Sequence, residues 1–86
     1  MSKIRILYFA SLREKIGKEA EEMELPAGVA TVAALRSHLR ARGGSYESAF
    51  SEKALLRSAI NQDMAQPAAA VKAGDEVAFF PPVTGG

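Results

Sequence analysis

Cysteine is absent from this 86-residue sequence, and histidine occurs once, at His38. Without cysteine the chain can form no disulfide, no thiolate nucleophile and no cysteine-ligated metal site of its own. A serine triad would have to place His38 beside a serine and an acid, yet no G-x-S-x-G motif supports such an arrangement. We therefore expect a protein that is not an enzyme by itself.

A long hydrophobic run is also lacking. The apolar stretch near the N-terminus is interrupted by Arg5 and closed by Arg13 and Glu14, so it is typical neither of a signal peptide nor of a membrane span. We expect a cytoplasmic protein that does not bind membranes. The net charge of +1 gives no reason to expect nucleic acid as a partner.

The sequence has few patterns that hold nucleotides, metals or anions. Gly43-Gly44 is followed by Ser45-Tyr46, without the lysine of a phosphate-binding loop, so we expect ATP to bind a partner instead. Glu22 and Glu24 share one face of an expected strand, which is usually the solvated side, and we expect no metal site. The solvated side of an amphipathic helix explains the local basic cluster better than an anion site does; this cluster comprises Arg36, His38, Arg40 and Arg42.

Length and patterning predict one small α+β domain over residues 1–80, with helices on one face of a mixed sheet and an extended tail over 81–86. Alternating polarity predicts the strands, and an i, i+3, i+7 apolar stripe after the N-cap residue Thr31 predicts the main helix. The expected elements are a strand over 3–9, a short helix over 11–16, a strand over 21–25, the main helix from 31 to 43–44, a loop over 45–54 that could hold a short extra helix, and strands over 55–61, around Met64 and over 76–80.

Strand alternation divides the apolar residues between a core and an exposed surface. Arg5 marks the solvent side of the first strand, so we expect Leu7 and Phe9 on that side as well. In the last strand, alternation places Phe79 toward the helix and Phe80 outward. Phe9 and Phe80 would then form an exposed apolar patch at the base of the tail, suited to docking a partner. The opposite assignment, with both phenylalanines in the core, stays an alternative.

The sequence ends in an apolar, proline-stiffened tail that closes with two glycines. Pro81 and Pro82 favour extended backbone geometry, so residues 81–86 can reach at most roughly 20 Å from the domain. Gly85 and Gly86 have no side chain to block a narrow channel, and the Gly86 carboxylate would be open to attack on an activated phosphate. This carboxylate is our candidate functional group, although two terminal glycines also arise by chance.

Three segments resemble a known protein family. The most specific is the terminal run Gly74 to Gly86, GDEVAFFPPVTGG, and the others are Tyr8-Phe9-Ala10 with Arg13-Glu14, and Ala59-Ile60-Asn61-Gln62. Together they resemble the ubiquitin-like sulfur carriers, and most closely the family of molybdopterin synthase small subunits. The resemblance implies a β-grasp fold, in which one main helix packs on one face of a mixed sheet and the C-terminal tail is flexible.

The resemblance also implies a carrier that is not catalytic by itself. An E1-like partner would adenylate the Gly86 carboxylate with ATP, sulfur from a donor system would replace the AMP, and the thiocarboxylate would supply sulfur to the pterin precursor Z to form the molybdopterin dithiolene. The synthase large subunit would be the second partner, in a heterotetramer, and this chain would bind no cofactor. The tail residues expected to enter a partner are Pro81, Pro82, Val83, Thr84 and Gly85. Strand alternation predicts Phe9 and Phe80 as docking residues, and the resemblance adds Met64.

Three other functions remain open. The first is a sulfur carrier for the thiamine thiazole or for tRNA thiolation, since these carriers share the terminal diglycine. The second is a protein modifier that joins Gly86 to a lysine through an isopeptide bond. The third is a ubiquitin-like binding module, for which Gly85-Gly86 would be dispensable. The run over 79–83 favours the molybdopterin pathway by resemblance alone.

Overall fold

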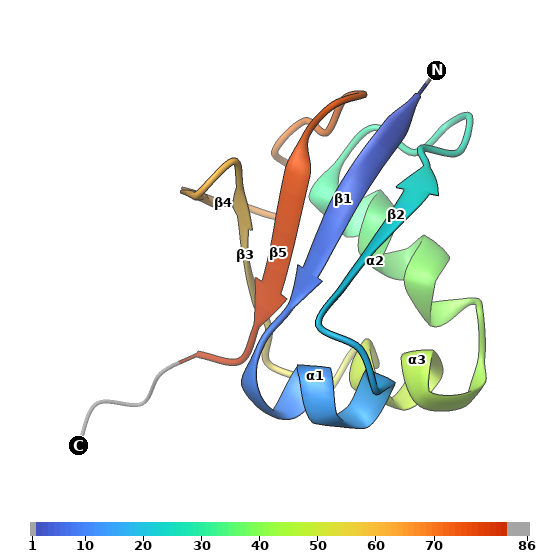
Figure 1. Ribbon diagram of the computed structural model, residues 1–86, viewed down its shortest axis with the longest axis vertical. Coiled ribbons are helices and arrows are strands. Elements are labelled where there is room, and N and C mark those ends of the chain that lie inside the picture. The colour runs from blue at the N-terminus through green and yellow to red at the C-terminus, as the bar shows by residue number, and fades with distance from the viewer. Residues whose placement is uncertain (1, 83–86) are drawn as a thin grey trace.

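A five-stranded mixed sheet forms the centre of the part of the protein that the computed structural model describes, residues 2–82 (Figure 1). Its strand order is β2-β1-β5-β3-β4, with β1 parallel to β5 and the other neighbours antiparallel. This is the α+β, β-grasp arrangement that was expected. The elements in chain order are β1 (Lys3–Tyr8), α1 (Ala10–Ile16), β2 (Ala20–Glu24), α2 (Val32–Arg40), α3 (Gly44–Ala49), β3 (Arg57–Ile60), β4 (Asp63–Ala65) and β5 (Glu76–Phe80).

The helices begin and end where local chemistry allows. Thr31 caps α2, because its Oγ1 accepts a hydrogen bond of 3.1 Å from the backbone N–H of Ala34. Gly17 ends α1 in the left-handed conformation, at φ 86°. The helix α2 ends at Arg40, earlier than expected, and Gly43 and Gly44 turn the chain with positive φ angles.

The expectation of a loop over 45–54 is wrong for its first half, where the alternative of a short extra helix is correct. Residues 44–49 form α3, and the chain reverses into it through the glycine pair. The reason is burial: Ala49 and Phe50 are each only 1% exposed, so this segment contributes to the core. Tyr46 is half-buried and packs against this core.

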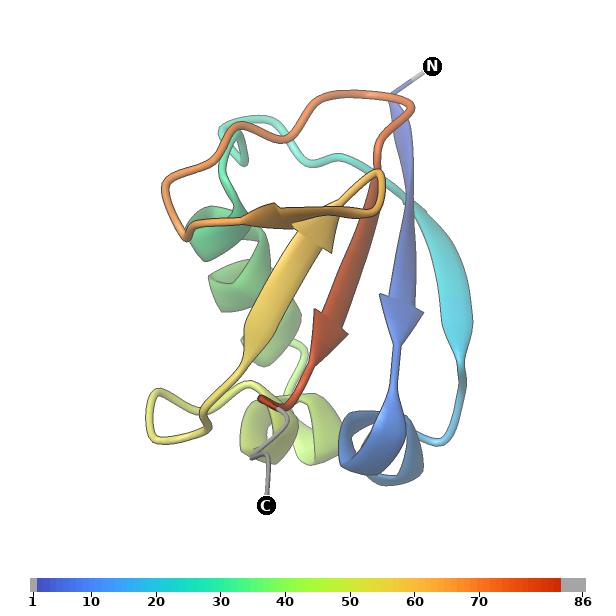
Figure 2. The same cartoon turned by 90° about the vertical axis from the view of Figure 1, so that its left-hand side faces the viewer.

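The core lies between the sheet and α2, with α1 and α3 at one end of the sheet (Figures 1 and 2). At its centre the Phe50 ring makes edge-to-face contacts with Tyr8 and Phe79, at centroid distances of 6.1 and 5.1 Å. Leu56 and Ile60 pack against this core. The buried cluster comprises Ile4, Ile6, Tyr8, Leu12, Val32, Leu35, Leu39, Ala49, Phe50, Val71, Val77 and Phe79.

The turn between β3 and β4 also fastens the start of β5. Asn61 and Gln62 both have positive φ, 50° and 73°, as a type I′ hairpin turn requires. The Asn61 amide donates to Asp75 Oδ1 and accepts from the Glu76 backbone, each at 3.0 Å. Burial alone would raise the pKa of Asp75, but hydrogen bonds from Lys72 and Asn61 outweigh it and lower the pKa.

The predicted tail is described only at its beginning. The strand β5 ends at Phe80, and Pro81 and Pro82 follow it outside any helix or strand, both half-buried. Residues 83–86, which include Gly85 and Gly86, lie outside the described residues, so the division into a domain and a tail stays a prediction. Within residues 2–82, no helix is both long and apolar enough to cross a membrane.

Candidate docking face and tail base

An apolar row crosses the outer face of the sheet, opposite α2. The ladder places Leu7 beside Ala78, Ala78 beside Ala59, and Ala59 beside Met64. Residues directly opposite each other on neighbouring strands share one face, so these four side chains form a continuous row. Met64 closes the row and is 61% exposed. We call the surface formed by this row together with Phe9 and Phe80 the docking face.

Phe9 and Phe80 lie at the end of this face from which the tail leaves. Phe9 continues β1 in an extended conformation and its side chain is 45% exposed. Phe80 is half-buried on the outer face, whereas Phe79 beside it is only 1% exposed in the core. The expected orientation of both strands is therefore confirmed, and the alternative with both Phe9 and Phe80 in the core is wrong. Although Phe80 points outward at the end of β5, it is only partly exposed.

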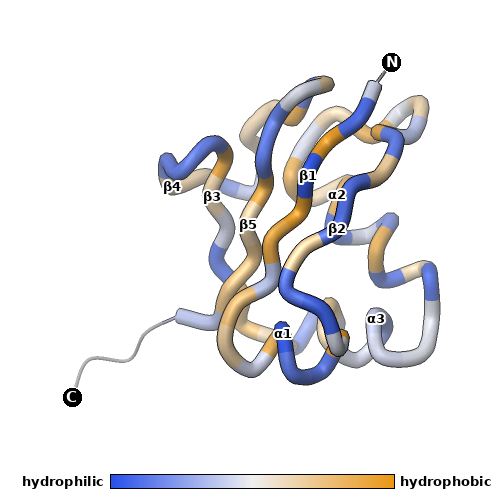
Figure 3. The backbone as a smooth tube through the Cα atoms, in the orientation of Figure 1, coloured by the Kyte–Doolittle hydropathy of each residue, from blue (hydrophilic) through white to orange (hydrophobic). Residues whose placement is uncertain are grey.

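Charged residues occupy the other end of the outer face. Arg5 lies between Glu22 on β2 and Glu76 on β5. Such a cross-strand row pairs opposite charges and stays hydrated. In Figure 3 the polar start of β5 gives way to more apolar residues toward the tail. The docking face is thus bounded by charge on one side and by the tail base on the other.

A polar cluster around Glu21 was not anticipated from the sequence. Glu21 lies opposite Ile6 and accepts hydrogen bonds from the hydroxyls of Tyr8 and Tyr46, at 2.7 and 2.9 Å. Arg42 Nη1 donates to it at 2.8 Å. Burial alone would raise the pKa of Glu21, but these three donors outweigh it and lower the pKa. Burial and then the hydrogen bond to Glu21 raise the pKa of Tyr8. Because these hydrogen bonds join Tyr8 on β1, Glu21 on β2 and Tyr46 on α3, the cluster ties the three elements together.

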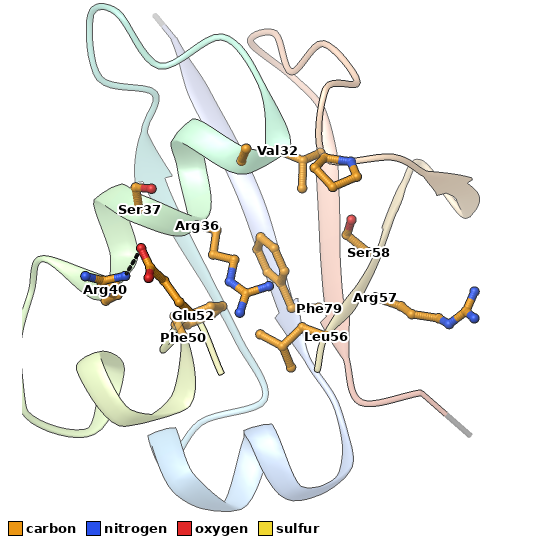
Figure 4. A pocket seen from close by; sticks show the side chains of 12 residues that line it. Val32, Arg36, Ser37, Arg40, Phe50, Glu52, Leu56, Arg57, Ser58 and Phe79 are labelled. Atoms are coloured by element: carbon orange, nitrogen blue, oxygen red, sulfur yellow. Dashed lines mark ion pairs between the residues drawn. The ribbon is translucent and has the colours of Figure 1, made fainter. Parts of the chain in front are cut away.

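The basic cluster does not form a single anion site, and its interpretation as a solvated helix face is only partly correct. Arg36 is half-buried, and its Nη2 donates to the backbone oxygens of Ser51 and Ala54 at 2.6 and 2.8 Å. Arg40 forms an ion pair of 3.3 Å with Glu52, while Arg42 belongs to the Glu21 cluster. Figure 4 shows Arg36 reaching into a cavity of about 290 Å³ between α2 and the sheet.

Leu55 is an exposed apolar residue that the sequence-based site prediction omitted. Its side chain is 78% exposed, more than Phe9 or Met64. The available signal was its position next to Leu56, which faces the core, since alternation would then direct Leu55 outward.

Elsewhere in the described chain, Glu22 and Glu24 are exposed as expected. Residues 2–82 contain no group of three histidine, aspartate or glutamate side chains placed to hold a metal ion.

This chain is similar to known proteins in both sequence and structure. The ThiS family model matches residues 6–86. The molybdopterin synthase sulfur carrier subunit of Haemophilus influenzae is 47% identical over 96% of this chain and 99% of that protein. A solved structure of a putative molybdopterin converting factor, subunit 1, from Pyrococcus furiosus matches this chain with a TM-score of 0.78 and 32% sequence identity. The match covers 96% of this chain and 100% of that one. The small archaeal modifier protein 1 of Haloferax volcanii is 25% identical with a TM-score of 0.74, covering 96% and 100%.

Proposed function

This chain belongs to the ThiS family, and on that premise we propose that it is the sulfur carrier subunit of molybdopterin synthase. The observation that carries the proposal is the arrangement at the tail base. The strand β5 contributes Ala78 and Phe80 to the docking face and then continues directly into Pro81 and Pro82. A partner held on this face would therefore receive the tail beside its own contact surface. The similarity to a named sulfur carrier subunit supports the same conclusion.

The chemistry would take place on the carboxylate of Gly86. A carboxylate is a poor acyl electrophile, so an activating partner would first join it to AMP, with release of pyrophosphate from ATP. A sulfur nucleophile would then displace AMP and leave a thiocarboxylate. This group is a soft nucleophile that can attack a carbon of precursor Z, and hydrolysis of the resulting thioester would leave the sulfur on the pterin and return the Gly86 carboxylate. Two such transfers, one thiocarboxylate for each, would supply the two sulfur atoms of the dithiolene. Because the sequence has no cysteine, the chain can hold the sulfur only at this terminus.

The proposal assigns the catalytic groups to the partners. The E1-like activating enzyme would bind ATP, and the synthase large subunit would bind the pterin, so this chain needs no cofactor or metal of its own. Phe9, Met64 and Phe80 would contact both partners in turn. Exposed methionine suits a surface that must fit two different proteins, because its side chain is flexible. Since activation consumes ATP, we expect the carrier to work in the cytoplasm.

Intact-mass spectrometry tests the carrier chemistry. The chain is incubated with its activating enzyme, ATP and a sulfur source, beside a matched chain that lacks Gly86. We expect a mass gain equal to the exchange of one oxygen for sulfur, located at the last residue and absent from the truncated chain. No gain under conditions that convert a known carrier would refute the proposal.

A second candidate function is protein modification, which the similarity to the small archaeal modifier protein favours. In that case Gly86 would form an isopeptide bond with a lysine of another protein. Cell extracts would then contain covalent adducts of this chain that resist thiol treatment. A thiocarboxylate without such adducts would exclude this function and favour the carrier.

A further inference from the structure

The β3–β4 edge of the sheet carries apolar surface that the docking face does not include. Leu55 precedes β3 and exposes 78% of its side chain. The residues that follow it in the chain, Leu56 and Arg57, line a hollow of about 260 Å³ between β3, β4 and the segment that follows β4. We call Leu55, Arg57 and this hollow the edge strip. Apolar and polar residues line the hollow together: Leu56, Arg57, Ser58, Met64, Ala65, Gln66 and Pro67.

The edge strip lies on the side of Phe80 opposite to Phe9, where Pro81 begins. The strand order places β1 on one side of β5 and β3 on the other. The last antiparallel pair between β3 and β5 joins Arg57 to Phe80. The chain that leads into Arg57 therefore reaches the sheet at the end where Pro81 begins. Figure 2 shows the loop before β3 and the start of the tail at this same end.

The edge strip is continuous with the docking face through Met64. This side chain ends the apolar row of the outer face and also lines the hollow. A partner seated on Phe80 and Met64 would thus meet the hollow directly. Arg57 adds a charge at this point. It is exposed, and among residues 2–82 it forms no ion pair. Arg57 lines the edge of the α2-side cavity, but its guanidinium extends away from Arg36 and Phe79 in Figure 4.

The segment that presents Leu55 is held in place from α2. Both hydrogen bonds of Arg36 Nη2 end on this segment, at the backbone oxygens of Ser51 and Ala54. The Arg40–Glu52 ion pair adds a third connection. Charge-assisted hydrogen bonds from a half-buried guanidinium are stronger than neutral ones, so they order the chain immediately before Leu55. Leu55 is therefore exposed on a segment that hydrogen bonds and an ion pair hold in place.

We propose that the synthase large subunit holds the edge strip as well as the docking face, so that it contacts the tail base from both sides. Leu55 would enter an apolar depression of the large subunit, and one of that subunit's carboxylates would pair with Arg57. A side chain with both apolar and hydrogen-bonding atoms would occupy the hollow, because Ser58 and Gln66 line it together with apolar residues. Positive charge and apolar surface at one site select an acidic partner surface with an apolar centre. This inference rests on the proposed function, because it requires that the large subunit takes up the tail.

The test compares two variants of the edge strip, Leu55→Ser and Arg57→Glu, with a charge-matched control, Lys72→Glu. Lys72 is exposed and precedes β5, at the end of the sheet remote from the tail. Binding to the purified large subunit is measured by calorimetry. We expect Leu55→Ser and Arg57→Glu each to weaken the affinity roughly tenfold, whereas Lys72→Glu changes it by less than about twofold. The Arg57→Glu effect should shrink as salt is raised, which a loss of folding would not produce.

The outcomes separate the edge strip from the proposed function. Thermal melting by circular dichroism checks that all three variants fold like the original chain, as expected for exposed positions. Unchanged affinity of both edge variants, with normal binding of the original chain, would overturn the edge strip and leave the proposed function intact. Failure of the original chain to bind the large subunit would overturn the proposed function, and the edge strip with it.

Discussion

Phe79 and Phe80 are neighbours in β5, yet they serve opposite sides of the sheet. Phe79 is 1% exposed and packs edge-to-face on Phe50, while Phe80 lies on the outer face at the tail base. This relationship places a core residue and a candidate docking residue next to each other. Substitutions at the two positions should therefore separate the stability of the chain from its binding.

The first prediction uses this pair. Phe80→Ala should weaken binding to both partners by roughly 1 to 3 kcal/mol and change stability less, because its side chain is only half-buried. Phe79→Ala should instead lower the free energy of unfolding by about 3 to 5 kcal/mol, since it empties the centre of the core. Calorimetry and urea unfolding measure the two effects. Unchanged affinity of Phe80→Ala for both partners would exclude it from the docking face.

The second prediction concerns acid stability. Hydrogen bonds from Arg42, Tyr8 and Tyr46 hold the pKa of Glu21 below its unfolded value despite burial, so the folded state favours the carboxylate. The stabilisation is present above the unfolded pKa and is lost as the pH falls through the folded pKa. Glu21→Gln should lower stability at neutral pH and flatten its decline in acid. Urea unfolding across the acid range, with exposed Glu24→Gln as the control, measures this. Identical pH profiles for Glu21→Gln and the original chain would contradict it.

The third prediction concerns the anchored segment. Arg36→Lys keeps the positive charge, but its side chain is one bond shorter, so the ammonium should not reach the position from which Nη2 donates to both Ser51 and Ala54. We expect the free energy of unfolding to fall by roughly 1 to 3 kcal/mol and the backbone amides of residues 51–56 to exchange hydrogen faster. If the edge strip binds the large subunit, the affinity should fall too. Exchange rates equal to those of the original chain would show that Arg36 does not order this segment.

The fourth prediction tests the start of α2. Thr31→Ala removes the oxygen that accepts from the Ala34 backbone, so stability should fall by about 1 kcal/mol. Thr31→Ser keeps an equivalent oxygen and serves as the matched control. Thermal unfolding measures both variants. Equal melting temperatures for Thr31→Ala and Thr31→Ser would exclude a capping role.

The sequence predicted those parts of the fold in which the local pattern and the tertiary environment agree. Alternation in β1 and β5 reproduced which residues face the core, and Thr31 marked the start of α2 correctly. The helix α3 was less predictable, because its short polar sequence has no apolar stripe and its position depends on burial of Phe50.

The site was predictable only in part, for reasons that also lie in tertiary contacts. Phe9 and Met64 were identified correctly as exposed apolar residues. Alternation with the exposed Glu22 and Glu24 would direct Glu21 inward, but its partner Arg42 was not predictable, because it is distant in sequence and comes close only through folding. Leu55 appeared as part of a strand, and its exposure depends on a segment held by Arg36.

The central claim is that sulfur carried on Gly86 becomes the dithiolene sulfur of molybdopterin. The most direct test incubates the thiocarboxylated chain with the purified large subunit and precursor Z, without ATP or any other sulfur source. We expect molybdopterin to form in proportion to the thiocarboxylate consumed, with the ordinary carboxylate of Gly86 regenerated in the mass spectrum. A thiocarboxylate that binds the large subunit but stays intact, with no molybdopterin formed, would contradict the account.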